Sequence, residues 1–181
     1  DLMETETQRT SRIVSNLLTF ARQSKMELRR LDLNRLIDQT ILLNANQLKL
    51  DGIRVVTQFE PNLPEMVGSE DQLQQVFMNL ISNAFEATRH EGTIRIRTHN
   101  QYIDTPIRGY DDIEEGDYVT LTVGDTGIGI AAQDIERIFE PFYTKKAMGR
   151  SGTGLGLAVV WNVVQDHKGY IDVTTHPGGT T

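Results

Sequence analysis

Apolar and polar positions near the start of the chain repeat at helical spacing. Residues 1–31 contain neither proline nor glycine, and their pattern predicts one long helix. Because polar residues fill the rest of its surface, the apolar stripe needs a covering partner. An N-terminal core helix of the same domain is the alternative. The stripe consists of Ile13, Val14, Leu17, Leu18 and Ala21, with Leu28 and Leu31 further on.

The pattern changes at Asp32, after which helices and strands mingle. A helix is predicted from residue 33 to just before residue 50, followed by a strand at 53–60. Ser69 and Gln72 form a capping box that opens another helix, which runs to about Arg89.

Two strands and one further helix follow, with a loop between the strands. Residues 93–102 and 117–125 alternate and predict strands, whereas residues 103–116 read as an acidic surface loop. A last helix ends at about Lys168, and 170–175 is a short strand. Without regular alternation of strand and helix, the chain predicts an α+β fold with helices on one face of a mixed sheet.

The helix after Ser69 carries two asparagines at the edge of its apolar face. Asn79 and Asn83 are four residues apart and therefore neighbours, with Glu86 beside them. Asparagine weakens a helix, so a magnesium ligand beside a phosphate chain would explain the pair. An exposed polar face is the alternative.

An aspartate ends the strand at 117–125. Asp125 shares parity with Val119, Leu121 and Val123, so it should point to the core-facing side. A carboxylate there is costly unless a group such as the amine of adenine hydrogen-bonds it. The alternative is a frayed strand, in which Asp125 merely starts a turn.

Two glycine clusters follow this aspartate. Gly127 and Gly129 let the backbone pack against a flat ligand, whereas "GTGLGLAVV" at 152–160 opens a helix whose free N–H groups suit phosphates. Between the clusters, Lys145, Lys146 and Arg150 lie on a stretch able to close over a ligand. Solvated surface loops are the alternative.

Other glycine motifs fit less well. The P-loop pattern is absent, and "GTGLGL" lacks the dinucleotide spacing. "GIGIAA" at 127–132 satisfies that fingerprint, but no second parallel strand with an acidic residue follows at the expected distance.

Composition narrows the function classes. The 181 residues carry a formal net charge of −7, which argues against a general binder of nucleic acid or anionic membranes. No apolar run approaches the roughly 18 residues of a membrane span. There is no cysteine, which excludes disulfides and thiolate metal sites. Both ends have the pattern of a cut segment, so the chain is expected to be a fragment.

These pieces, in this order, resemble the catalytic ATP-binding domain of sensor histidine kinases, in the wider family shared with gyrase, Hsp90 and MutL. "NLISNAFEA" is similar to the asparagine box, "DTGIGI" to the first glycine box, "FEPFYTKK" to the phenylalanine box and "GTGLGLAVV" to the second glycine box. The residues within these boxes are similar to those of the nitrogen-regulation type of histidine kinase. The resemblance implies a two-layer α/β sandwich of the Bergerat type.

The resemblance also implies roles for single residues. Asn83 would ligate magnesium with support from Asn79, and Asp125 would receive the adenine amine in a pocket shaped by Gly127 and Gly129. Asn79 and Lys146 would be the catalytic residues, with Lys145 at a position that is often threonine. The glycine-rich segment would present backbone to the phosphates of ATP through Gly152, Thr153, Gly154, Leu155 and Gly156.

The implied function is transfer of the ATP γ-phosphoryl group to a histidine, for relay to a response-regulator aspartate. ATPase relatives carry a glutamate where Asn79 stands, and its absence favours transfer over hydrolysis. Residues 1–31 would be the second helix of a dimerisation and phosphotransfer hairpin, and 32–181 the catalytic domain with its last strand cut off. The first hairpin helix, with the acceptor histidine, is missing, so self-phosphorylation is not expected. The four histidines His90, His99, His167 and His176 are interpreted as ordinary surface residues.

Partners and location follow from the same resemblance. The full protein would dimerise through the hairpin and meet a receiver domain, whereas the fragment would contact neither nucleic acid nor membrane. A cytoplasmic location is expected, with a membrane anchor elsewhere in the full protein as an option. The alternatives are an ATP-hydrolysing relative and an interaction module with a vestigial pocket.

Overall fold

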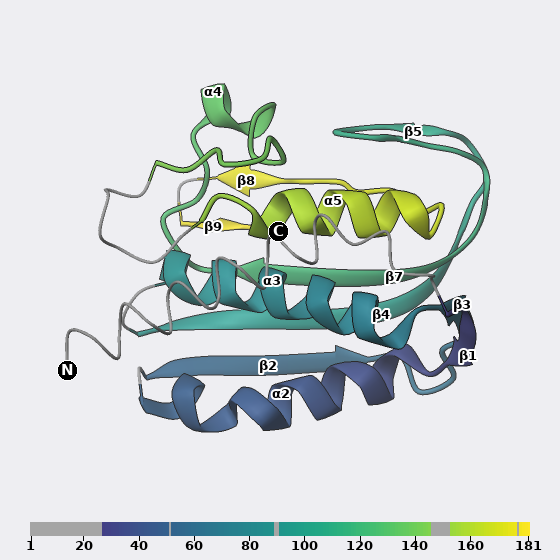
Figure 1. The fold of residues 1–181 in the computed structure, drawn as a ribbon, viewed down its shortest axis with the longest axis horizontal. Coiled ribbons are helices and arrows are strands. Elements are labelled where there is room, and N and C mark those ends of the chain that lie inside the picture. The colour runs from purple at the N-terminus through teal and green to yellow at the C-terminus, as the bar shows by residue number, and fades with distance from the viewer. Residues whose placement is uncertain (1–26, 51, 89–90, 146–152, 177) are drawn as a thin grey trace.

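The structure contains a five-stranded mixed sheet with three long helices packed on one face (Figure 1). The computed structural model describes residues 27–50, 52–88, 91–145, 153–176 and 178–181. In the sheet, β2 and β4 are parallel and the other neighbours are antiparallel. The strand order is β2 (Ile53–Phe59), β4 (Gly92–Ile103), β7 (Gly116–Asp125), β9 (Gly179–Thr180) and β8 (Thr175–His176).

The long helices α2 (Leu33–Leu50), α3 (Glu70–Thr88) and α5 (Gly156–Asp166) lie together on one face of this sheet, whereas the short α4 (Ala132–Ile135) stands apart (Figure 1). The α+β, two-layer prediction is therefore confirmed. None of the helices in the described residues is long and apolar enough to cross a membrane.

The core forms between the helices and the sheet, as the periodicity predicted. Phe77 of α3 is 1 % exposed, and Ile94 and Ile96 of β4 are fully buried. The alternate residues Val119, Leu121 and Val123 of β7 pack against this cluster. A second cluster joins α3 to α5 through Val76, Val159, Val160 and Val163.

The predicted N-terminal helix does not reach residue 31. Arg29–Leu31 forms strand β1, which pairs antiparallel with β3 (Met66–Gly68). Leu31 is buried in the main core, so pairing and burial outweigh local helix preference at this point. Residues 27–28 lie in neither a helix nor a strand, and residues 1–26 of the predicted helix lie outside the described residues.

The capping box at the start of α3 is also wrong. The Ser69 N–H donates to Nε2 of His167 at 2.9 Å instead of to Gln72, whose Oε1 is buried with no hydrogen-bond partner in the described structure. His167 is therefore not an ordinary surface histidine. Its Nδ1 lies 2.7 Å from the Val163 carbonyl oxygen, so Nδ1–H donates there and Nε2 accepts.

Two short segments differ from the sequence prediction. Residues 170–174 lie outside any strand, and the strand begins only at Thr175, although Thr174 and Thr181 exchange two backbone hydrogen bonds. The acidic loop contains a hairpin of β5 (Ile107–Arg108) and β6 (Asp112–Ile113) that curls over α5 (Figure 1).

Candidate functional site

Asp125 sits at the end of β7, where the strand is still paired with Ile94 and Thr180. The frayed-strand alternative is therefore wrong. Its Oδ1 accepts a hydrogen bond from the Gly127 N–H at 2.7 Å. Burial raises the pKa of the Asp125 carboxyl, and the backbone N–H groups of Gly127 and Thr180 partly oppose that rise. A half-buried carboxylate is thus oriented by backbone donors at the edge of the core.

The first glycine cluster is closely surrounded by protein backbone. A Cβ on Gly127 would lie 2.4 Å from the carbonyl carbon and oxygen of Ala87, at the end of α3. Gly129 has a φ of +72°, and its Cβ would lie 2.5 Å from the His176 carbonyl oxygen. Glycine is required here by the contact of this turn with α3 and β8. Its predicted role against a flat ligand stays a prediction.

Asn79 of α3 faces the start of α5. A Cβ on Gly156 would come within 3.6 Å of Asn79 Oδ1, so the side chain lies beside the second glycine cluster. Its Nδ2 is buried and has no hydrogen-bond partner among the described residues. The alternative of an exposed polar face is therefore wrong for Asn79. A buried amide without a partner is costly, and an anionic ligand oxygen would satisfy it.

Asn83 lies one turn further along α3 and is half-buried. No group of three or more histidine, cysteine or acidic side chains able to hold a metal occurs in the described part of the chain. A magnesium ion at Asn83 would therefore need phosphate oxygens and water as further ligands, which is how this ion is usually bound.

The second glycine cluster opens α5 without a side-chain cap at Leu155. The first N–H groups of a helix without such a cap are suited to an anion. Leu155 itself is fully buried, and its N–H donates to Thr153 Oγ1 at 3.3 Å. Its predicted contact with nucleotide would thus involve backbone only.

Gly154 is the middle glycine of the second cluster, and its conformation is described. It has a φ of +67°, and its carbonyl oxygen accepts a hydrogen bond from the Phe142 N–H at 2.8 Å. The ring of Phe142 is 63 % exposed. The backbone of Phe142, and not its ring, therefore makes this contact with the second cluster. Gly152, Lys146 and Arg150 lie outside the described residues.

Lys145 is engaged within the protein. Its Nζ lies 2.6 Å from Oδ2 of the buried Asp134, and the Tyr143 hydroxyl donates to Oδ1 of the same carboxylate at 2.8 Å. Hydrogen bonding from Lys145 lowers the pKa of Asp134, and the Asp134 carboxylate raises the pKa of Tyr143. A predicted phosphate contact of Lys145 would have to replace this ion pair.

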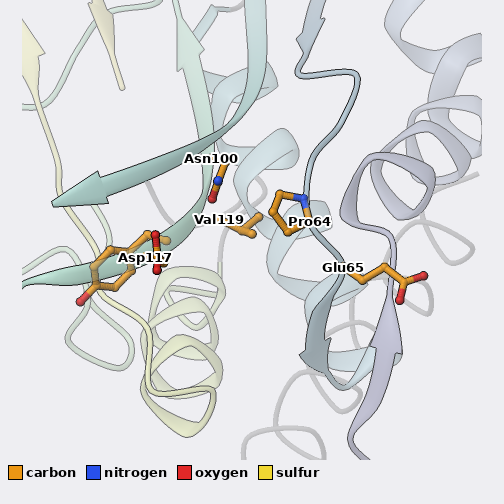
Figure 2. Close-up of a pocket in the computed structure, with 6 residues that line it drawn as sticks. Pro64, Glu65, Asn100, Asp117 and Val119 are labelled. Atoms are coloured by element: carbon orange, nitrogen blue, oxygen red, sulfur yellow. The ribbon is translucent and has the colours of Figure 1, made fainter.

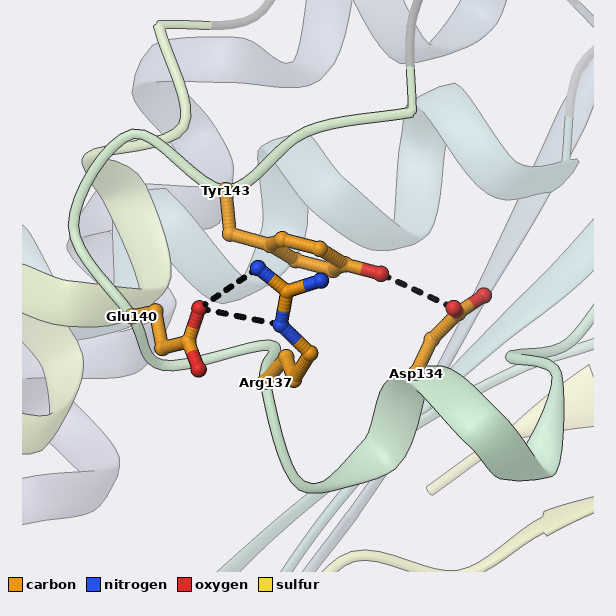
Figure 3. Close-up of polar contacts among 4 residues, drawn as sticks. All are labelled: Asp134, Arg137, Glu140 and Tyr143. Atoms are coloured by element: carbon orange, nitrogen blue, oxygen red, sulfur yellow. Dashed lines mark hydrogen bonds and ion pairs between the residues drawn. The ribbon is translucent and has the colours of Figure 1, made fainter.

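Arg137 completes the group of polar contacts around Tyr143 (Figure 3). Its guanidinium lies 4.4 Å from the centre of the Tyr143 ring and is bonded to Glu140 at 3.0 and 3.1 Å. Nothing in the local sequence pattern predicts the contact between Asp134 and Tyr143, which are nine residues apart.

Two hollows in the described surface lie away from the predicted site residues. One is lined by Pro64, Glu65, Asn100, Asp117, Tyr118 and Val119, at the opposite end of β7 from Asp125 (Figure 2). The other lies beside α5 and includes Tyr110 and Trp161. The candidate site is therefore identified by the orientation of its polar groups and not by either of these hollows.

Comparison with known proteins agrees with this geometry. Residues 68–181 match the family described as histidine kinase-, DNA gyrase B- and HSP90-like ATPase. The match covers the asparagine helix, Asp125 and both glycine clusters.

Two curated relatives cover almost the whole chain. The sensor histidine kinase ZraS of Escherichia coli O157:H7 is 36% identical over 98% of this chain and 35% of its own length. The sensory histidine kinase/phosphatase NtrB of Rhodobacter capsulatus is 34% identical over 99% of this chain and 49% of its own length. The chain thus spans about a third to a half of these relatives.

A solved structure shares the fold. The histidine kinase ThkA in complex with the response regulator protein TrrA has a TM-score of 0.75 and 23% identity, covering 99% of this chain and 47% of that one.

Proposed function

Since the chain belongs to the histidine kinase-, DNA gyrase B- and HSP90-like ATPase family, we propose that it binds magnesium–ATP and supplies the γ-phosphoryl group to a histidine outside residues 1–181. The phosphoryl group would then pass to an aspartate of a response regulator. The observation that carries this proposal is the Asp125 carboxylate, which the Gly127 N–H orients at the end of β7.

Asp125 is suited to an adenine amine. A half-buried carboxylate accepts a hydrogen bond from an exocyclic amine, and a charge-assisted bond of this kind contributes about 1.5–3 kcal/mol. Gly127 and Gly129 hold the turn that follows against α3 and β8, so the carboxylate is set before a ligand arrives.

We propose that the phosphates of ATP bind between α3 and α5. The Asn79 side chain, whose Nδ2 has no hydrogen-bond partner among the described residues, places its Oδ1 beside Gly156, and the uncapped first turn of α5 offers N–H groups to the same region. Asn83 would hold the magnesium, which would neutralise charge on the transferring group. Asn79 and Lys146 would orient the phosphates, whereas the acceptor histidine comes from another element.

We also propose two partners of the full protein, a receiver domain and a second copy of the same chain. The solved ThkA complex contains a response regulator, which supports a receiver domain as the partner of the full protein. A homodimer formed through a helical hairpin, with residues 1–31 as its second helix, stays a proposal. So do a cytoplasmic location and a possible anchor elsewhere in the full protein.

Two measurements test the function. Calorimetry should show binding of magnesium–ATP, and radioactive γ-phosphate should not label the chain alone. A histidine-bearing hairpin of a relative such as ZraS, added in trans, should become labelled slowly, because the proximity given by tethering is absent. Fast steady-state ATP hydrolysis would favour the ATPase alternative, and no nucleotide binding would favour the interaction module.

Asn83→Ala tests the metal assignment. We expect weaker ATP binding mainly when magnesium is present, because the lost oxygen is a metal ligand and not a base contact. Ser82→Ala is the matched control, since Ser82 is an exposed neighbour on the same helix. An equal loss of affinity with and without magnesium would mean a packing defect in α3.

A further inference from the structure

The tip of the β5–β6 hairpin is docked on the body of the domain. Residues 104–109 are exposed, but Tyr110 at the tip is half-buried. The hairpin curls over α5 toward α4 (Figure 1). Burial raises the pKa of the Tyr110 hydroxyl, in keeping with a ring inserted among other groups.

Three aromatic rings from three segments meet at this tip. The ring centre of Tyr110 lies 5.0 Å from that of Phe139 and 5.9 Å from that of Trp161, and both contacts are edge-to-face. Phe139 and Trp161 also touch each other, at 5.4 Å. Such pairs are attractive beyond the burial of their surface.

Polar contacts hold the tip in the same place. The Tyr110 N–H donates to Oδ1 of Asp172 at 3.2 Å, and Nε2 of Gln165 donates to the Asp111 carboxylate at 3.1 Å. A Cβ on Gly109 would lie 2.6 Å from Asp172 Oδ1, so only glycine allows this approach without a shift. The tip is thus built to fit this surface.

The two aromatic partners of Tyr110 belong to segments that lead toward the proposed nucleotide site. Phe139 precedes Phe142, whose N–H is bonded to the Gly154 carbonyl oxygen. Trp161 lies on α5, one and a half turns after Gly156, which faces Asn79. Tyr110 therefore links the segment after α4 to the helix that opens at the second glycine cluster.

We propose that Tyr110 is a positioning residue for the nucleotide site, which it serves by holding the segment around Phe139 at a fixed distance from α5. This inference rests on the proposed function. The ring carries the role, because the Tyr110 hydroxyl has no hydrogen-bond partner among the described residues.

Three variants test the role. Tyr110→Ala removes the ring, Tyr110→Phe keeps it, and Tyr102→Ala removes a 61 % exposed tyrosine of β4 at the base of the same hairpin. Each variant is studied where circular dichroism shows it fully folded. Calorimetry with magnesium–ATP should then give a dissociation constant roughly three- to tenfold higher for Tyr110→Ala, and within about twofold of wild type for the other two.

Hydrogen exchange without nucleotide gives an independent measurement. Tyr110→Ala should speed exchange in residues 132–145 and at the start of α5, but not in β4 and β7. Lower thermal stability with unchanged affinity and unchanged local exchange would overturn the proposal, as would an equal effect of Tyr102→Ala. If the wild type does not bind nucleotide, the proposed function is wrong. In that case hydrogen exchange alone tests the positioning role, and unchanged local exchange in Tyr110→Ala would contradict it.

Discussion

The glycines of the two clusters look alike in sequence, but Gly156 of the second cluster differs from Gly127, Gly129 and Gly154 in its surroundings. Gly127 and Gly129 face protein backbone at 2.4 and 2.5 Å from a would-be Cβ, and Gly154 faces Phe142 in the same way. The three atoms nearest a would-be Cβ on Gly156 belong to the Asn79 side chain, the first at an ordinary 3.6 Å. Three of these glycines are therefore demanded by the fold itself. At the fourth, Gly156, a Cβ would make only ordinary van der Waals contacts, at the helix N-terminus where we propose the phosphates bind.

The variants Gly127→Ala and Gly156→Ala test this difference most directly. Gly127→Ala should lower the free energy of unfolding by about 3 kcal/mol, because its Cβ would overlap the Ala87 backbone. Gly156→Ala should change it by less than about 1 kcal/mol, since alanine is the better helix former and has room. Urea unfolding measures both, and similar values for the two would refute the distinction.

Asp125→Asn tests the proposed adenine contact beside the first glycine cluster. It should weaken ATP binding about 10- to 100-fold, because a charge-assisted hydrogen bond to the adenine amine is lost. Calorimetry measures this loss, and an unchanged affinity would remove Asp125 from the adenine site.

The same variant has a predicted pH dependence. Burial raises the pKa of Asp125 in the folded state, so the folded protein binds more protons there than the unfolded chain. Its contribution to the free energy of unfolding therefore falls as pH rises from about 4, the unfolded pKa, through the raised folded pKa. Asp125→Asn should abolish that decline in urea unfolding measured between these limits. A decline of equal size in the variant would assign it to other groups.

His167→Ala tests how α5 is held against α3 at the end remote from the second cluster. The Ser69 N–H would lose its acceptor, and we expect a loss of about 1–2 kcal/mol in the free energy of unfolding. His99→Ala is the control and should have little effect, because the contact of the His99 ring within the described structure is to Gln101, two positions away. Equal losses for both would contradict the structural role of His167.

Lys145→Ala is expected to have the smallest effect on nucleotide affinity. Because Lys145 is paired with Asp134, its loss should change ATP affinity by less than about threefold, as for an exposed ion pair. Lys146→Ala is the matched comparison and should weaken ATP binding more, if Lys146 is the phosphate contact. Calorimetry on both variants decides, and a larger loss from Lys145→Ala would reverse the assignment.

Features that depend on local periodicity could be predicted from the amino-acid sequence alone. The 3.6-residue repeat of α3 identified its buried face, including Phe77, and the two-residue repeat of β7 placed Asp125 on the same side as Val123. The order of the four boxes identified the family before any contact was known. Such patterns are readable because each residue's orientation follows from its own helix or strand.

Only the tertiary structure decided which distant groups meet. Ser69 and His167 are 98 residues apart, and Tyr110 and Asp172 are 62 apart. The contact between Ser69 and His167 takes the place of the predicted capping box. The contact between Tyr110 and Asp172 holds the tip of the predicted loop on the rest of the domain. Local periodicity carries no information about such pairs, because their energy arises only when packing brings the two segments together. The same holds for Arg29–Leu31, where pairing with β3 made a strand from residues with helical spacing.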